Sequence, residues 1–340
     1  MKYILSIAFC LQWVFPLLAQ ESILNCTDSS YCVPAVTGMP RTKGIIIRQE
    51  RIMDYGIRSN SKSDMLRSGS GQVSSNRRWE FKLRLPIISK PNFAIAAGIH
   101  YNVEEYKFEP PQNEEYPLYK SLEDKSLKSI GGSIYVVKPW RGKRYFLLRA
   151  SGDLNGDYGA DGISKKNFLQ FSIAPLIGWK ANDNTSYAFG FAYGYNFGRP
   201  VISPLISYNH TFNKHWGLET MLPTKVKVRY SLNEKTLFFA STELNGARYN
   251  IRLADSVLAK RGNFYLQKAE IRYLISFERE IHDWLWFGLE AGLRSNINFS
   301  LSDKTGPARN ALIRNQLNHA MLVSFSLFAV APRKFLKTRN

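Results

Sequence analysis

The stretch SYAFGFAYGYNFG, residues 186–198, places unlike side chains at alternate positions. Successive side chains of an extended chain point to opposite faces. One face of this segment would therefore carry only Ser, Ala, Gly and Asn. The pattern predicts a β-strand whose other face is wholly aromatic, made of Tyr187, Phe189, Phe191, Tyr193, Tyr195 and Phe197.

The same alternation returns in segments 77–85, 93–106, 169–179, 267–278 and 284–299. Each sets large apolar side chains against polar or small ones. Ordinary strands average about five or six residues, and a tilted strand needs about 9–11 residues to cross a bilayer. A period of two that persists through so many long segments predicts an all-β protein with strands of membrane-spanning length.

Two features favour lipid on the apolar faces. Charged residues such as Lys82 and Arg272 stand in the middle of the polar faces, which suits a wet interior, and aromatics such as Trp79 and Trp179 stand at strand ends. We therefore predict a closed antiparallel transmembrane β-barrel in which the aromatic row of 186–198 faces lipid. A soluble sandwich or a lipocalin-like barrel, which can use the same alternation, is the alternative.

The connections predict the strand number. Short polar turns alternate with longer connections at 57–76, 109–125, 155–165, 253–263 and 300–316. Outer-membrane barrels alternate short periplasmic turns and longer external loops in this way. The alternation holds for about 14 strands if 217–231 forms two short strands broken at Pro223, because proline cannot donate to a sheet ladder. If that pair instead turns inward, the number is 12.

The N-terminus has a basic start, an apolar stretch and a small residue before a polar stretch, which predicts a cleaved signal peptide. Export permits oxidation, so Cys26 and Cys32 are candidates for a disulfide. The predicted division of the chain is a signal peptide at 1–20, an N-terminal periplasmic segment at 21–43, the transmembrane barrel at 44–331 and a basic C-terminal tail at 332–340.

The charge is strongly basic, with 46 Lys and Arg against 27 Asp and Glu and a formal net charge of +19. The basic residues are scattered rather than clustered, which argues against nucleic acid as a partner. Acids on the same faces neutralise them only in part, so an open lumen would favour anions. In the alternative, ion pairs cross-link a closed interior. The predicted lumen-facing basic residues are Arg78, Lys82, Arg84, Arg149, Lys225, Lys227, Arg229, Arg248, Lys268 and Arg272.

Catalytic chemistry has weak candidates. His100 and Glu104 both fall on a predicted inward face, and His100 could act as a general base towards Ser129 or Ser133 of the next strand. No spacing within one strand shows that these groups meet. The Asp- and Gly-rich segment 152–162 lacks the ligand order and the closing Glu of a calcium loop, so we predict no metal or cofactor site.

Several motifs carry a family resemblance. They are the Gly-Arg-Pro turn at 198–200, WGLETMLP at 216–223, the Arg229–Tyr230 pair and NGARY at 245–249. The chain resembles a family of bacterial outer-membrane barrels known only as a domain of unknown function. The resemblance implies a barrel and an outer-membrane address, and no catalytic residue. One departure is that many such barrels end on an aromatic residue, whereas this chain continues past Val330.

These observations lead to one principal hypothesis and two alternatives. The principal hypothesis is a passive channel or small-solute transporter of the bacterial outer membrane with a basic, anion-favouring lumen. The alternatives are an enzyme that modifies lipid or lipopolysaccharide, and a structural or adhesive barrel that acts through its external loops. The expected partners are the lipid bilayer, lipopolysaccharide, the outer-membrane assembly machinery and a small anionic solute.

Overall fold

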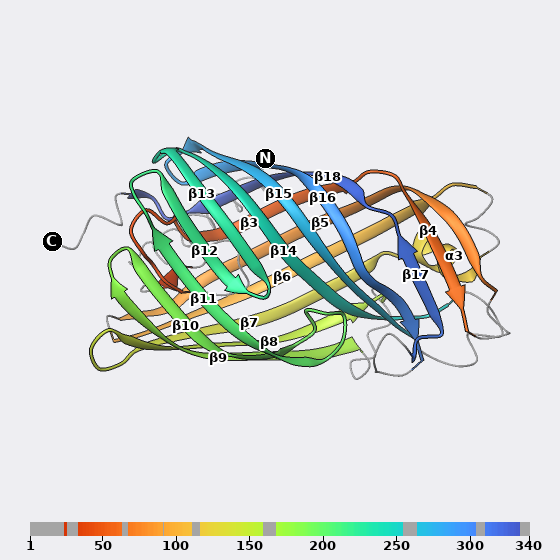
Figure 1. The fold of residues 1–340 in the computed structure, drawn as a ribbon, viewed down its shortest axis with the longest axis horizontal. Coiled ribbons are helices and arrows are strands. Elements are labelled where there is room, and N and C mark those ends of the chain that lie inside the picture. The colour runs from red at the N-terminus through yellow and green to blue at the C-terminus, as the bar shows by residue number, and fades with distance from the viewer. Residues whose placement is uncertain are drawn as a thin grey trace, which may run out of the picture.

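A computed structural model describes residues 24–25, 33–62, 67–90, 92–110, 116–158, 168–253, 264–303 and 310–333. The expected signal peptide, both candidate disulfide cysteines and residues 334–340 lie outside these ranges. Within them the chain forms a closed antiparallel barrel (Figure 1). A small separate sheet pairs β1 (Leu24–Asn25) with β2 (Val33–Pro34).

The barrel wall contains 14 strands in the described part of the chain, as the turn pattern predicts. The ring closes because β18 pairs with β3 and β15 pairs with β16. The wall strands are β3 (Lys43–Ile52) continued by β4 (Tyr55–Ser61), β5 (Gly69–Lys90), β6 (Phe93–Phe108), β7 (Leu127–Pro139), β8 (Arg144–Gly156), β9 (Leu169–Asn182), β10 (Thr185–Gly194), β11 (Val201–Thr211), β12 (Trp216–Leu222), β13 (Lys225–Asn233), β14 (Thr236–Ile251), β15 (Phe264–His282), β16 (Leu285–Ser302), and β17 (Ile313–Leu317) continued by β18 (Ala320–Val330).

The predicted short pair exists. β12 and β13 form a hairpin that turns at Pro223–Thr224 in the wall, and neither strand folds inward. Other strands are longer than expected: β4 and β5 occupy most of the connection predicted at 57–76, and β8 extends into the segment considered as a calcium loop. The segment at 57–76 has few apolar residues to alternate, so its sequence resembles a connection, but its backbone pairs across the sheet: β4 pairs with β5 and with β17.

The outer surface of the barrel is apolar. In β10, Phe191 is 63% exposed and the next residue, Ala192, is 4% exposed. Exposed apolar side chains continue around the wall, including Ile99, Ile134, Phe171, Ile206, Ile275, Leu289 and Phe325. A continuous outer surface of this kind fits hydrocarbon, so the wall spans a membrane with its strands. Separately, no helix among the described residues is long and apolar enough to cross a membrane.

The aromatic row of 186–198 is shorter than predicted. β10 ends at Gly194, and Tyr195 and Phe197 belong to the turn that leads to β11. Tyr187, Phe189, Phe191 and Tyr193 keep the outward alternation, and the half-buried Tyr195 ring lies beside that row, with its centroid 6.3 Å from that of Tyr193. The alternation of side chains holds only while the backbone stays extended, and Gly198 has a positive φ of 71° that ends the pattern.

The end of the barrel that carries the longer connections is called here the long-loop end. At this end Asn250 of β14 pairs directly with Gly156 of β8. Strands β9 to β13 do not extend this far, so the ring of strands is smaller here than in the middle of the barrel. The helix α3 (Pro117–Asp124) packs inside this smaller ring. Tyr119 stacks on Phe108 with ring centroids 4.7 Å apart and its hydroxyl lies 2.8 Å from the Ser59 hydroxyl. Apolar residues from the strands that reach the long-loop end, including β4, β5, β6, β14, β15 and β16, surround the helix and fill this end.

The opposite end, called here the short-turn end, is covered by residues 33–42. The Thr37 amide donates to the Asp183 carbonyl at 2.8 Å, and Met39 packs on buried apolar residues inside the wall. The Arg41 guanidinium lies 3.2 Å from carboxylate oxygens of Glu280 and of Asp283. Both ends of the lumen are therefore filled by the protein's own residues.

Candidate functional site

A polar cavity of about 310 Å³ lies in the lumen between these two ends. Strands β5 to β10 and β14 supply its wall, because their inward positions in this region carry polar or small side chains. The charged residues that line it are Glu80, Lys82, Arg84, His100, Arg149 and Asp153. Three permanent cations thus face two carboxylates, and the lining has a net positive charge.

Two arginines meet around one tyrosine in this cavity. The Tyr135 hydroxyl interacts with the side chains of Ser133 and Arg149 and lies in the field of the Arg84 guanidinium. The Arg149 Nη1 donates to Ser172 Oγ at 3.1 Å. Guanidinium groups pair with carboxylates in a planar, two-point geometry. The cluster is suited to hold a small anion.

The predicted pair of His100 and Glu104 does not form. His100 Nε2 lies 3.4 Å from both Ser129 Oγ and Asp153 Oδ1, whereas Glu104 binds Arg78 and Lys268. The two residues are four positions apart on one strand, so each meets a different set of neighbours across the lumen.

This arrangement does not activate a nucleophile. In a catalytic triad one ring nitrogen faces the serine and the other is held by the acid. Here the serine and the acid share Nε2 of His100 at 3.4 Å, and Asp153 also accepts a hydrogen bond from Ser151 at 3.1 Å. The sequence correctly suggested Ser129 as a neighbour of His100 but missed Asp153. Asp153 lies in the Asp- and Gly-rich segment 152–162, which the sequence analysis considered only as a possible calcium loop.

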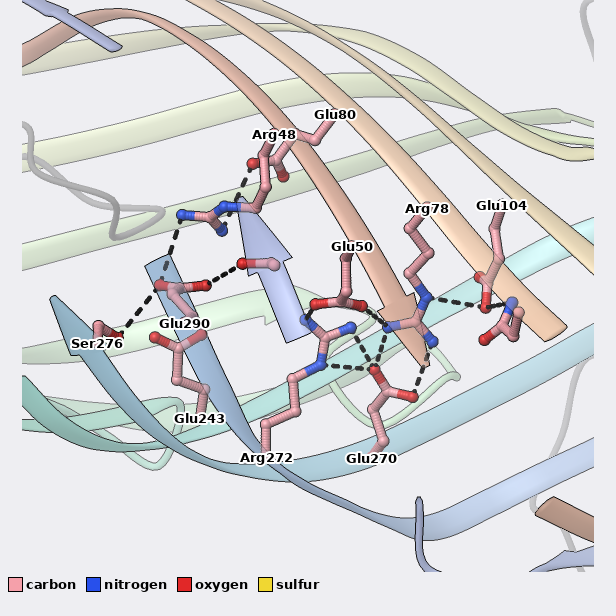
Figure 2. Close-up of polar contacts among 12 residues, drawn as sticks. Arg48, Glu50, Arg78, Glu80, Glu104, Glu243, Glu270, Arg272, Ser276 and Glu290 are labelled. Atoms are coloured by element: carbon pink, nitrogen blue, oxygen red, sulfur yellow. Dashed lines mark hydrogen bonds and ion pairs between the residues drawn. The ribbon is translucent and has the colours of Figure 1, made fainter. Parts of the chain in front are cut away.

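A belt of buried ion pairs crosses the lumen next to the cavity (Figure 2). The Arg78 guanidinium lies 2.7 Å from Glu270, 2.9 Å from Glu104 and 3.0 Å from Glu50. Arg272 lies 2.9 Å from Glu50 and 2.6 Å from Glu270. These residues come from β3, β5, β6 and β15, so their side chains join separate parts of the wall and narrow the lumen.

A second cavity, of about 210 Å³, lies against this belt. It shares Glu80, Asn102 and residues 245–247 with the first cavity. The lumen is therefore a chain of two connected polar spaces with filled ends and a bridged middle. Of the two predicted interiors, the ion-paired one describes this structure.

Most of the other predicted basic residues also have partners. Lys82 lies 2.6 Å from Glu80 and Lys225 lies 2.7 Å from Glu243. The Arg229 Nε lies 3.4 Å from Glu219, and the Lys227 ammonium lies 3.7 Å from the centre of the Phe239 ring. The strand alternation placed them on the inner face, but only the tertiary structure shows what each one meets.

Arg248, unlike the other predicted lumen-facing basic residues, does not lie on the inner face. It lies on the face of β14 opposite to Ala247 and Tyr249, which line the cavity, so the prediction that it faces the lumen is wrong. Its guanidinium is instead stacked between the rings of Tyr195, at 4.7 Å, and Tyr265, at 5.0 Å. Arginine stacks well on aromatic faces when it is shielded from water.

Several acids of the lumen, including Glu50 and Glu243, were not among the residues predicted from the sequence. Glu50 alternates with Arg48 and Ile46 in β3 on the inner face, so the period of two could have identified it. No group of three or more His, Cys, Asp and Glu side chains in the described residues could hold a metal ion.

With the geometry established, comparison with known proteins gives the family. The family described as Domain of unknown function (DUF6268) matches residues 54–326, and the chain belongs to it. This agrees with the resemblance seen in the motifs at 198–249. No curated protein matches the sequence at a significant level.

Three solved structures are similar in outline. They are a Pseudomonas aeruginosa FadL homologue (10% identity, 90% of this chain and 98% of that chain, TM-score 0.41), the Pseudomonas putida toluene transporter TodX (10%, 92% and 97%, 0.36) and the translocator domain of the autotransporter NalP from Neisseria meningitidis (10%, 83% and 88%, 0.34). Similarity this low says nothing about the interior side chains, whose function has to come from their own geometry.

Proposed function

We propose that this protein is an outer-membrane barrel that carries small acidic solutes, and that the cavity around Arg84 and Arg149 is where the solute binds. The main support is the juxtaposition of these two guanidinium groups with Tyr135, Ser133 and Ser172 in a cavity of about 310 Å³. The surplus of permanent cations over carboxylates in the lining favours a negative solute.

The alternation of connection lengths around the wall supports an outer-membrane address. Alternating tight turns and longer connections are typical of barrels from that membrane, with the short turns on the periplasmic side. On this proposal residues 33–42 and Arg333, which lie at the short-turn end, face the periplasm. Cell fractionation with an antibody against the full chain tests this. Recovery with the inner membrane or the soluble fraction would contradict it.

Because both ends of the lumen are filled, we expect gated transport and not a permanently open pore. Residues 33–42 cover the short-turn end and α3 fills the long-loop end, so a solute passes along the barrel axis only when both of them move, together or in turn. The protein should therefore behave as a gated carrier of small solutes, with brief openings, and not as a wide and permanently open pore.

Calorimetry with matched ligands tests the site. The purified full chain in detergent should bind benzoate at least ten times more tightly than benzamide, which has nearly the same shape without the charge. Arg84→Ala and Arg149→Ala should each weaken benzoate binding by about tenfold or more. Lys138→Ala, at an exposed cation on β7, is the matched control. Equal binding of both ligands, or no binding of either, would overturn the proposal.

Planar-bilayer recordings test the passage itself. In a KCl gradient the reversal potential should show anion preference, and the Arg84→Ala, Arg149→Ala double variant should lose it. A cation preference in the unmodified protein, or the absence of current in every salt, would contradict the transport function.

A further inference from the structure

The barrel wall has a gap beyond the hairpin of β12 and β13, between the edges of β11 and β14, and this gap is called here the notch. β12 has 7 residues and β13 has 9. A strand rises about 3.4 Å per residue and tilts by about 45°, so β12 climbs about 17 Å, less than the roughly 25 Å apolar band of a membrane barrel. The tip of this hairpin therefore lies within the hydrocarbon layer.

No strand pairing closes the wall above that tip in the described residues. The pairing of β11 with β12 stops at Ile206 and Leu222, and the pairing of β13 with β14 stops at Lys225 and Glu243. Above it, β14 meets β8 again at Asn250. Between these points the facing edges of β11 and β14 are separated. Ile202, on β11 beyond the tip, is 71% exposed, so the outer apolar surface extends past the notch.

A single turn covers the notch. Residues 195–200, called here the strap, join β10 to β11 and lie against β14 and β15. A Cβ at Gly246 would collide with the Asn196 carbonyl, and a Cβ at Gly198 would lie 2.7 Å from the Lys268 carbonyl oxygen. Both positions require glycine because two backbones touch there.

The strap is held weakly. In the part of the chain that the structure describes, the backbone hydrogen bond within the strap joins the Gly198 amide to the Tyr195 carbonyl, and no backbone hydrogen bond joins the strap to β14. Its side-chain contact with the wall is the stack of Tyr195 on Arg248, at 4.7 Å. A wall strand of the same length would instead carry a ladder of backbone hydrogen bonds on each edge.

The cavity reaches the strap from inside. Gly194, Tyr195, Asn196, Thr224 and residues 244–247 line the same cavity as Arg84 and Arg149. Tyr195 and Asn196 are only half-buried, so one layer of residues separates the polar lumen from the outer surface here.

We infer that the notch is a lateral portal between the lumen and the bilayer, and that the solute is an acidic amphiphile. Its carboxylate binds the Arg84–Arg149 cluster, and its apolar chain passes under the strap into hydrocarbon. This inference rests on the proposed anion site and adds to it the class of solute and its route. A purely hydrophilic anion has no use for an opening at this depth.

Photo-crosslinking tests the route. The probe is a ten-carbon straight-chain carboxylic acid with a diazirine at its far end, and the full chain is held in lipid nanodiscs. After illumination, labelled residues should fall in 195–200, 222–225 and 244–247. The amide of the same probe, which lacks the charge, should label these segments at least five times less, and so should the Arg84→Ala, Arg149→Ala double variant.

The outcomes separate this inference from the proposed function. Acid-dependent labelling that falls on α3 or on residues 33–42 would overturn the portal and leave the anion site intact, since the chain would then lie along the barrel axis. Labelling that does not depend on the charge would overturn both.

Variants of the strap give a second test. Gly246→Val should push the strap off β14 and speed the release of the bound probe by at least tenfold. Gly132→Val is the matched control, because the nearest atom to a Cβ there is 3.8 Å away. The heat-modified gel mobility of each variant confirms that the barrel has folded. Release rates equal to those of the control would overturn the portal.

Discussion

The long-strand wall and the short-strand wall of this barrel are held together differently. The long-strand wall includes β5 with 22 residues, β15 with 19 and β16 with 18. The short-strand wall, β10 to β13, has strands of 7 to 11 residues. Strands that are longer than the membrane is thick bring inward side chains together on the long-loop side of the cavity. There the belt of ion pairs and the apolar cluster fill the lumen. Strands shorter than the membrane leave the strap to complete the wall.

The difference shows where such a barrel is stable and where it can open. In the long-strand wall β15 pairs along most of its length with both β14 and β16, and the interior is bridged by buried charges. Separating two strands of this wall would expose both unpaired backbone groups and buried charges. In the short-strand wall the strap can move without breaking a strand ladder. We therefore expect substitutions in the two walls to differ in kind, with losses of stability in the first and changes of solute release in the second.

The largest expected effect is in the belt. Arg78→Ala leaves three glutamates without the guanidinium they share, and should lower the free energy of unfolding by about 3–5 kcal/mol. Arg229→Ala, in the short-strand wall, leaves one glutamate at 3.4 Å and should cost less. Urea unfolding followed by the gel mobility of the folded barrel measures both. Equal losses would contradict the contrast between the walls.

The next effect is at the long-loop end. Leu118 of α3 is buried in the apolar cluster, so Leu118→Ala should lower the free energy of unfolding by about 3 kcal/mol. It should also raise the frequency of channel openings, because the helix fills that end of the lumen. Lys120→Ala, at an exposed position of the same helix, is the control. Unchanged stability and openings in Leu118→Ala would show that α3 does not seal the lumen.

A smaller effect is expected in the short-strand wall. Tyr187 stacks on Trp179 of the paired strand, with ring centroids 5.6 Å apart. Tyr187→Leu keeps an apolar side chain but removes this stack, and should cost about 0.5–1 kcal/mol. The same urea unfolding assay measures it. A loss as large as that of Arg78→Ala would mean that the short-strand wall is not the weaker one.

The smallest effect concerns pH at the short-turn end. Burial would raise the pKa of Asp283, but the Arg333 amide bonded to its carboxylate and the guanidinium groups of Arg41 and Arg333 lower it below the ordinary 3.8. The contribution of this carboxylate to stability is therefore present above about pH 3.8 and is lost as the pH falls through the lower, folded-state pKa.

Asp283→Asn provides the comparison. The variant should be slightly less stable than the unmodified protein at pH 6, and the two unfolding curves should converge in acid. A difference that persists or grows in acid would have the wrong sign for a carboxylate whose pKa is lowered by folding.

The barrel could be predicted from the order of the residues alone. The alternation in segments such as 77–85 and 284–299 fixes which side chains face outward, because the side-chain period of an extended strand is two wherever the strand lies in the fold. The alternation of tight turns and longer connections predicted the number of strands, and Pro223 predicted the position of the short hairpin. These features are local, so they can be read along the chain.

The contacts of the inward residues became apparent only in the folded barrel. The sequence placed Arg78, Lys268 and Arg272 in the lumen but gave no sign that they share Glu50, Glu104 and Glu270, because these residues come from four strands and up to 222 positions apart. It also put Arg248 on the wrong face. The partners of a side chain across a closed ring depend on register and on where each strand ends, and those are properties of the whole wall.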